Sequence, residues 1–291
     1  MSKSENQQIL QVRYDKLFHD LFNKENISTI EWVAMQILGC TYEEIKGNVS
    51  VVDARLTRIN KNERNKYVDL LIQYNQEKII IELNQNFDGN YLKNVLFATN
   101  TILNNYSMEG FDYKKVSRCI LVNLNWYPKT YTKIKRETPG KEVIIWDYPS
   151  RKVSGYLLKI ININLDFYDN VSYDKLDTSD KFYKLLTVSD SKELNEIVDG
   201  EHLLGRYTSK LIKYSNDEKY KEAIMDEIIE KNALMQERYL SGLYDGMEQG
   251  IQENQKDIVI NMYKEKIALD VISKVTKLSV DEINEIISQE K

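Results

Sequence analysis

Two acidic residues on neighbouring segments are the part of the sequence most suited to chemistry. Asp69 lies in VDLLI, and Glu82 directly follows the apolar run III. Segments 66–74 and 77–84 have the composition of β-strands, and the turn-forming pair Asn75-Gln76 separates them, so together they predict a β-hairpin. A two-residue turn there makes the numbers of opposed residues sum to 151, which places Asp69 opposite Glu82.

An opposed pair of carboxylates is suited to binding a divalent cation. Like charges that face each other destabilise a hairpin, and a cation between them reverses that effect. The chain has only two histidines and two cysteines, so a metal would be held mainly by carboxylates, which favours Mg²⁺ or Mn²⁺. Side chains alternate along a strand, so Asn84 shares a face with Glu82. The alternative is that both acids simply lie on the solvent face of an amphipathic hairpin.

The elements around the hairpin predict an α/β protein. Apolar spacings of three and four predict a helix over 8–24, and the capping-box sequence STIE predicts a second helix from Ser28 to Gly39. A third helix is expected over 90–106. The remaining strands are expected over 48–59, 116–124, 142–146 and 155–168. This order predicts a mixed β-sheet flanked by helices in a first domain, residues 1–170.

A helical C-terminal region is predicted over 171–291, with two short helices around a turn within 268–287. Gly242, Gly246 and Gly250 recur every four residues in this region, and that spacing puts them on one helix face. Such a face could pack closely against another helix, including that of a second copy in a homodimer. The alternative is a flexible or frayed helix, since each glycine costs about 1 kcal/mol relative to alanine.

Composition narrows the classes of function. No run of about 18 apolar residues predicts a membrane-spanning helix, and the first ten residues lack the apolar core of a secretory signal, so we expect a cytoplasmic protein. The net charge of −5 argues against a protein that coats nucleic acid. It allows a local basic groove, and segments 55–66 and 129–136 are basic. They are equally well explained as solvated loops.

Five motifs occur in an order that resembles a known family. They are YDKLFHDLF (with Asp15, Phe18 and Phe22), VDLLI, IIIELN, KNVLF and VSRCILVNLNW. Together they are similar to the Rpn proteins, also called PD-(D/E)XK nuclease family transposases, of the restriction-endonuclease-like superfamily. The resemblance implies a restriction-endonuclease-like core and a magnesium-dependent DNA endonuclease that serves recombination, mobile-element movement or phage defence.

The resemblance also implies roles for individual residues. Asp69, Glu82 and the main-chain carbonyl of Leu83 would hold Mg²⁺ or Mn²⁺. Asn84 would assist the attacking water. Substrate DNA would contact Lys93 of KNVLF, and His19 and Asp15 of the opening motif.

Three positions depart from the family pattern. His19 replaces the opening lysine, Asn84 stands where a glutamine or lysine is usual, and Lys93 replaces an arginine. Asn84 has a shorter reach than lysine and no charge. These departures motivate an alternative function, in which a catalytically weakened nuclease-fold protein acts through DNA or protein binding and self-association.

Overall fold

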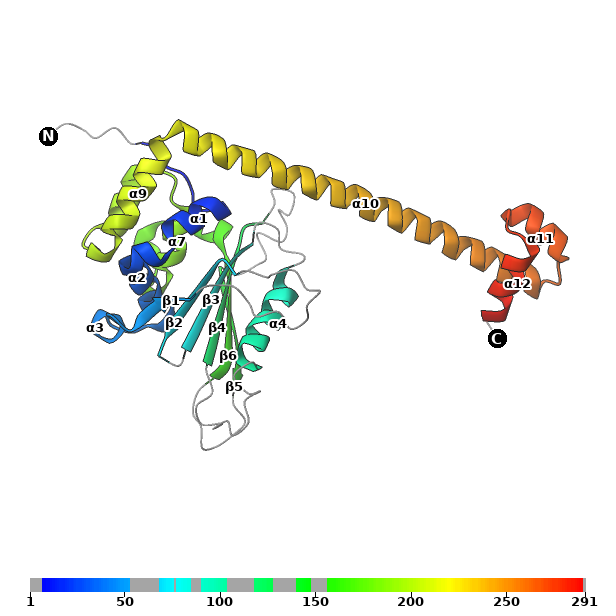
Figure 1. The fold of residues 1–291 in the computed structure, drawn as a ribbon, viewed down its shortest axis with the longest axis horizontal. Coiled ribbons are helices and arrows are strands. Elements are labelled where there is room, and N and C mark those ends of the chain that lie inside the picture. Colours follow the sequence, from blue (N-terminus) through cyan, green and yellow to red (C-terminus); the bar gives the residue numbers. More distant parts are fainter. Residues whose placement is uncertain are drawn as a thin grey trace. The chain divides into compact units, whose positions relative to one another are not determined.

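The computed structural model describes residues 7–52, 68–75, 77–84, 90–103, 118–127, 140–147 and 156–289 (Figure 1). The basic segments 55–66 and 129–136 lie outside these residues, and so does part 53–59 of the expected strand 48–59. The chain divides into two compact units, Met1–Ile224 and Met225–Lys291. The predicted domain boundary was residue 170, close to the end of the last described strand at Asn164.

Six strands form one mixed sheet. They are β1 (Val49–Val51), β2 (Leu70–Tyr74), β3 (Glu77–Asn84), β4 (Arg118–Asn125), β5 (Lys141–Asp147) and β6 (Tyr156–Asn164). Their order is β1-β2-β3-β4-β6-β5. The central strands β3, β4 and β6 run parallel, whereas the other neighbouring pairs are antiparallel. The expected mixed sheet is therefore confirmed.

The described residues form helices on both sides of the sheet and after it. The α-helices are α1 (Asp15–Leu21), α2 (Ile27–Leu38), α3 (Tyr42–Ile45), α4 (Asn90–Leu103), α6 (Leu165–Asp169), α7 (Lys181–Thr187), α8 (Ser191–Val198), α9 (Gly205–Asn216), α10 (Glu218–Lys264), α11 (Leu269–Thr276) and α12 (Val280–Gln289). Short 3-10 helices are η1 (Lys24–Asn26), η3 (Tyr173–Lys175), η4 (Thr178–Asp180) and η5 (His202–Leu204). The α/β protein with a helical C-terminal region is thus confirmed.

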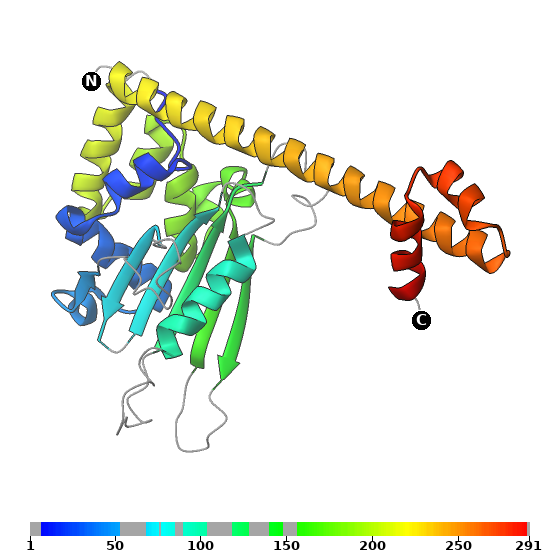
Figure 2. The same ribbon diagram turned by 45° about the vertical axis from the view of Figure 1, so that its right-hand side comes forward.

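Both faces of the sheet are covered, which explains the apolar runs in its strands. Helix α4 packs on one face, where Phe97, Ala98 and Ile102 join a core with Ile80 and Leu121. Helices α1, α2 and α7 lie on the other side of the sheet (Figures 1 and 2). The polar side chains near the ends of β3, β4 and β6 therefore lie within a covered structure.

The predicted hairpin register is confirmed. Leu70 pairs with Ile81 and Tyr74 pairs with Glu77, and the numbers of both pairs sum to 151. Asn75 follows β2 with a φ of 51°, the left-handed conformation that asparagine tolerates in tight turns. Gln76, the other predicted turn residue, lies outside the described residues.

Two expected elements begin or end in different places. Residues 8–14 were expected to be helical but precede α1 as an extended segment, in which Ile9 N–H donates to the carbonyl of Ser189 and Val12 N–H to that of Leu186. The expected strand 155–168 ends at Asn164, and α6 follows it directly. Local periodicity misassigned residues 8–14 because main-chain hydrogen bonds to distant parts of the chain determine their conformation.

The start of α2 is also corrected. Ser28 lies inside the helix, which begins at Ile27 after Asn26, so the expected capping box does not form. The carboxylate of Glu31 instead accepts the N–H of Gly47 at 2.9 Å. The predicted end is confirmed, since Gly39 adopts a left-handed φ of 70° and its N–H donates to the carbonyl of Met35 at 2.8 Å.

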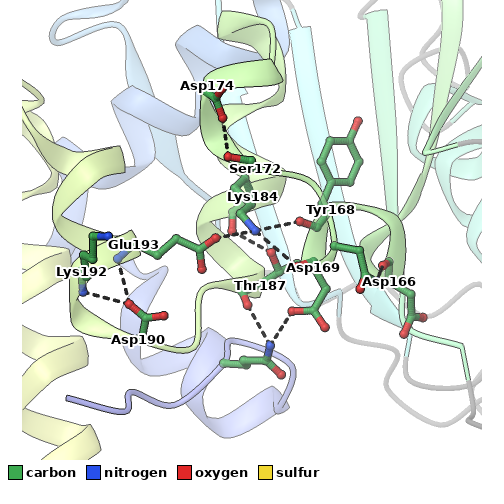
Figure 3. A network of polar contacts seen from close by, with 12 residues as sticks. Asp166, Tyr168, Asp169, Ser172, Asp174, Lys184, Thr187, Asp190, Lys192 and Glu193 are labelled. Carbon is green, nitrogen blue, oxygen red and sulfur yellow. Dashed lines mark hydrogen bonds and ion pairs between the residues drawn. The ribbon is translucent and has the colours of Figure 1, made fainter. Parts of the chain in front are cut away.

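A buried lysine joins the helices that follow the sheet. The side chain of Lys184, on α7, is 2% exposed, and its ammonium lies 2.6 Å from Oε1 of Glu193 on α8. It also donates to the carbonyls of Tyr168 at 3.0 Å and Asp169 at 3.4 Å, at the end of α6 (Figure 3). Its three N–H donors thus have three acceptors, which satisfies the buried charge.

The C-terminal unit has its own small core. Val259 of α10, Ile272 of α11 and Ile283 of α12 are fully buried against one another. The two short helices expected within 268–287 are confirmed as α11 and α12. Ser279 and Glu282 form a capping box at the start of α12, with Ser279 N–H donating to Glu282 Oε2 at 2.7 Å. No described helix is long and apolar enough to cross a membrane.

Candidate active site

Asp69 lies one residue before β2, at the end of the sheet where β3 finishes. Its Oδ2 accepts the N–H of Leu83 at 2.6 Å. Extending the confirmed register by one residue places Asp69 opposite Glu82, as the sequence predicts. The side chain of Asp69 is 21% exposed, so it is partly shielded and still reachable from solvent.

Glu82 lies on β3, two residues before the strand ends. It is half-buried, and its Oε1 is shielded from water. The N–H and carbonyl of one strand residue point to the same side of the strand. Because the N–H of Leu83 reaches Asp69, its carbonyl also faces the side on which Asp69 lies. The two acids and this carbonyl therefore meet at one corner of the sheet.

Helix α1 brings a histidine to this corner. His19 Nε2 lies 3.7 Å from Oδ1 of Asp69, and the histidine side chain is 51% exposed. Asp15 is the first residue of α1, about one helical turn before His19, and is half-buried. Lys93 is exposed on α4. Of the three predicted substrate contacts, the structure thus places His19 directly beside Asp69.

Asn84 belongs to a cluster of side-chain amides that the sequence analysis missed. We call this group the amide cluster; its members are Asn84, Asn94, Asn123, Asn125 and Asn162. Asn84 Nδ2 donates to Asn125 Oδ1 at 3.1 Å, and Asn84 Oδ1 accepts from Asn94 Nδ2 at 3.4 Å. The cluster lies on the sheet face covered by α4, the face that also carries Glu82.

A signal for the amide cluster is present in the sequence. Asparagine alternates with an apolar residue in NLN at 123–125 and in NIN at 162–164. Alternation places both asparagines of each strand on one face. The parallel register then aligns Asn84 with Asn125, and Asn123 with Asn162. Detecting this alignment requires the strand order, which the sequence alone does not supply.

A cation near the strand ends was also missed. Trp126 follows β4, and its main-chain N–H donates to the carbonyl of Asn84 at 2.8 Å. The guanidinium of Arg13 lies 4.7 Å from the centre of the Trp126 ring. Arg13 precedes α1, so the segment that carries His19 also brings a permanent positive charge to this end of the sheet.

The available ligands fit a hard cation. No group of three or more histidine, cysteine, aspartate or glutamate side chains that could hold a metal is found among the described residues. The corner offers two carboxylates and one carbonyl, which are all oxygen ligands. Mg²⁺ is commonly bound by one or two carboxylates and completes its shell with water and substrate phosphate. This set therefore suits Mg²⁺ better than a metal that prefers nitrogen or sulfur.

The chain matches no protein-family model, no curated protein sequence and no solved structure.

Proposed function

We propose that this protein is a metal-dependent DNA endonuclease with a restriction-endonuclease-like core. The observation that carries the proposal is the β2–β3 register, which brings Asp69 opposite Glu82 beside the Leu83 main chain. An acid pair at the end of covered strands is electrostatically unfavourable unless a cation compensates it. The family resemblance of five motifs supports the same assignment. We further propose a cytoplasmic role in recombination, mobile-element movement or phage defence.

Each residue of the corner has a role in this proposal. Asp69, Glu82 and the carbonyl of Leu83 hold Mg²⁺ or Mn²⁺, which when bound activates water and stabilises charge on the phosphate. The Leu83 N–H fixes the orientation of the Asp69 carboxylate through Oδ2. His19 and Lys93 supply positive or hydrogen-bonding groups for the phosphate, with Asp15 at the start of the same helix as His19.

Asn84 retains hydrogen-bonding capacity for a water. A side-chain amide has two N–H donors and two acceptor lone pairs. One donor is used on Asn125 and one lone pair on Asn94, so one of each remains. The proposed assistance to the attacking water therefore requires no break in the amide cluster.

The test is cleavage of supercoiled plasmid DNA with Mg²⁺ and with a chelator. Asp69→Ala and Glu82→Ala should each abolish Mg²⁺-dependent cleavage. Glu43→Ala is the matched control, because Glu43 is an exposed acid on α3 that lies in a different element from the acid pair. Cleavage by the acid-pair variants at the wild-type rate would refute the proposal.

A second candidate function is binding and self-association by a catalytically weakened protein. The observation that favours it is a row of exposed apolar side chains on α10: Leu240, Leu243, Met247 and Ile251. Spacings of three and four place them on one helix face, as in helix–helix interfaces. Apart from the neighbouring backbone of α10 itself, a Cβ added at Gly242, Gly246 or Gly250 meets no described atom within 4 Å. A second copy is therefore the proposed partner of this helix.

Sedimentation and DNA binding distinguish the two functions. A homodimer that buries this face should dissociate in Leu243→Glu, whereas Glu237→Gln, elsewhere on the same helix, should leave it intact. An unchanged sedimentation coefficient in Leu243→Glu would refute dimerisation through this face of α10. DNA binding without cleavage in Mg²⁺ would favour the second function over the first.

A further inference from the structure

We propose that Asn94 is a positioning residue for the candidate active site. Its side-chain amino group orients the amides of the cluster and, through Asn84, the polar end of β3. Asn94 lies on α4, next to Lys93 in sequence. The orientation of the amides is a property of the fold alone, whereas its catalytic consequence rests on the proposed endonuclease.

The amide cluster is buried and continuous. Asn84, Asn94, Asn123 and Asn125 are each between 1% and 4% exposed. Asn94 Nδ2 lies 3.4 Å from Asn84 Oδ1 and 3.0 Å from Asn123 Oδ1. Asn94 is thus the only member of the described cluster whose amino group reaches two other amides. Buried polar groups that lose their partners are costly, so this connection restricts the side chains that can occupy position 94.

One branch of hydrogen bonds runs from Asn94 through Asn84. Asn94 donates to Asn84, Asn84 Nδ2 donates to Asn125 Oδ1 at 3.1 Å, and Asn125 Nδ2 donates to the main-chain carbonyl of Asn123 at 3.3 Å. A carbonyl can only accept a hydrogen bond. The end of the branch therefore fixes the direction of every bond in it, and Asn84 must present its oxygen to Asn94.

The second branch runs from Asn94 towards the edge of the sheet. Asn94 donates to Asn123, Asn123 Nδ2 donates to Asn162 Oδ1 at 3.0 Å, and Asn162 Nδ2 donates to Glu142 Oε2 at 2.9 Å. An ionised carboxylate also only accepts, so this branch too has a fixed direction. Both branches consequently require a donor at position 94.

The two branches together explain why position 94 carries an amide. Each branch needs one N–H, and the Asn94 amino group has two. Aspartate would present oxygen to two oxygens, and leucine of similar size would leave Asn84 Oδ1 and Asn123 Oδ1 without this donor. The same two bonds tie α4 to β3 and β4. Asn94 therefore holds the Asn84 amide in the direction that the branch fixes, and it also positions the helix that carries Lys93.

The first experiment measures side-chain amide hydrogen exchange by NMR and needs no DNA. Both Nδ2 protons of Asn94 should exchange at least about a hundredfold more slowly than those of Asn100, a half-buried asparagine of the same helix. In Asn94→Leu, the side-chain N–H signals of Asn84 and Asn123 should shift and broaden. Equal exchange at Asn94 and Asn100 in the wild type would overturn the proposal, even if Asn94→Leu fails to fold.

The second experiment measures DNA cleavage at a temperature where each variant is folded. Asn94→Leu should lower kcat at least about tenfold with KM unchanged, because a misplaced group at the reacting centre slows chemistry more than binding. Asn100→Leu, the matched control, should retain wild-type kcat. An unchanged kcat in folded Asn94→Leu protein would reduce Asn94 to a structural residue. If the wild type never cleaves DNA, the proposed endonuclease is refuted. The exchange result then still decides whether Asn94 orients the buried amides.

Discussion

Replacing Asp69 separates a metal-binding carboxylate from a structural one. Asp69→Ala removes the acceptor of the Leu83 N–H, a bond of 2.6 Å in the structure. A hydrogen bond to a charged group contributes about 1.5–3 kcal/mol when buried. Because the Asp69 side chain is 21% exposed, water replaces part of this bond, and relief of the repulsion with Glu82 offsets more. We therefore expect a loss of about 1–2 kcal/mol.

Asp69→Asn has a different expected effect. The amide oxygen of asparagine can still accept the Leu83 N–H, although a neutral acceptor makes a bond weaker by about 1 kcal/mol. Removing one charge also relieves the repulsion across the hairpin, which contributes up to about 1 kcal/mol. The two effects nearly cancel. The metal-free Asn variant should therefore unfold within about 1 kcal/mol of the wild type.

Thermal melting with and without Mg²⁺ completes the test. A cation that binds only the folded protein raises its stability by about 1.4 kcal/mol at roughly ten times its Kd. Wild type should show this increase, whereas Asp69→Asn and Asp69→Ala should not, because a neutral amide is a poor ligand for a hard dication. If Mg²⁺ stabilises none of the three proteins, and the Asn and Ala variants melt equally early, Asp69 has a structural role.

Two further predictions concern the core. Lys184→Met should lower the free energy of unfolding, measured in urea, by about 2–3 kcal/mol, because it leaves Glu193 and two carbonyls without their donor. Lys192→Met is the control, because this side chain is 77% exposed. It should change the free energy of unfolding by less than about 0.5 kcal/mol. Burial raises the pKa of the Cys119 thiol from 9.0 to about 12. The contribution of this thiol to the free energy of unfolding is therefore fully present below pH 9 and is lost progressively as the pH rises to 12. Cys119→Val should therefore lose less stability than wild type over this alkaline range.

Specific outcomes would contradict these two predictions. Equal losses for the two lysine variants would show that the Lys184 contacts add nothing beyond those of an exposed lysine. Wild type and Cys119→Val losing stability in parallel up to pH 12 would show that the thiol does not couple folding to pH.

The hairpin was predictable because its determinants are local. A two-residue turn fixes the register of both strands, and unbroken apolar runs such as III before Glu82 identify strands covered on both faces. Residues 8–14 were not predictable in this way. Their spacing of buried residues fits a helix, but the segment is held in an extended form by carbonyls near residues 186–189, and sequence periodicity does not report such distant partners.

The same difference between local and distant partners applies to the candidate site. The acid pair depends on residues 13 positions apart within one hairpin, whereas the amide cluster joins Asn84 to Asn125 and Asn123 to Asn162, 41 and 39 positions apart. Because asparagine is rare in strands, composition alone favours a turn or an edge position for these residues. Only the parallel order of β3, β4 and β6 turns these isolated residues into one buried group.

The amide cluster also predicts the result of introducing a lysine at position 84. Asn84 is 3% exposed and bonded to Asn94 and Asn125, so a longer, charged side chain there would break the branch that runs through Asn84 and bury an ammonium group. Asn84→Lys should therefore lose about 3 kcal/mol or more of unfolding free energy, and it should not raise Mg²⁺-dependent cleavage.

Asn100→Lys is the matched control, because it introduces the same charge on α4 at a half-buried position; it should lose less. Denaturant unfolding and plasmid cleavage of both variants measure the effect. A stable Asn84→Lys protein with faster cleavage would mean that position 84 can accommodate a lysine, and that the buried amides do not constrain the chemistry of this corner.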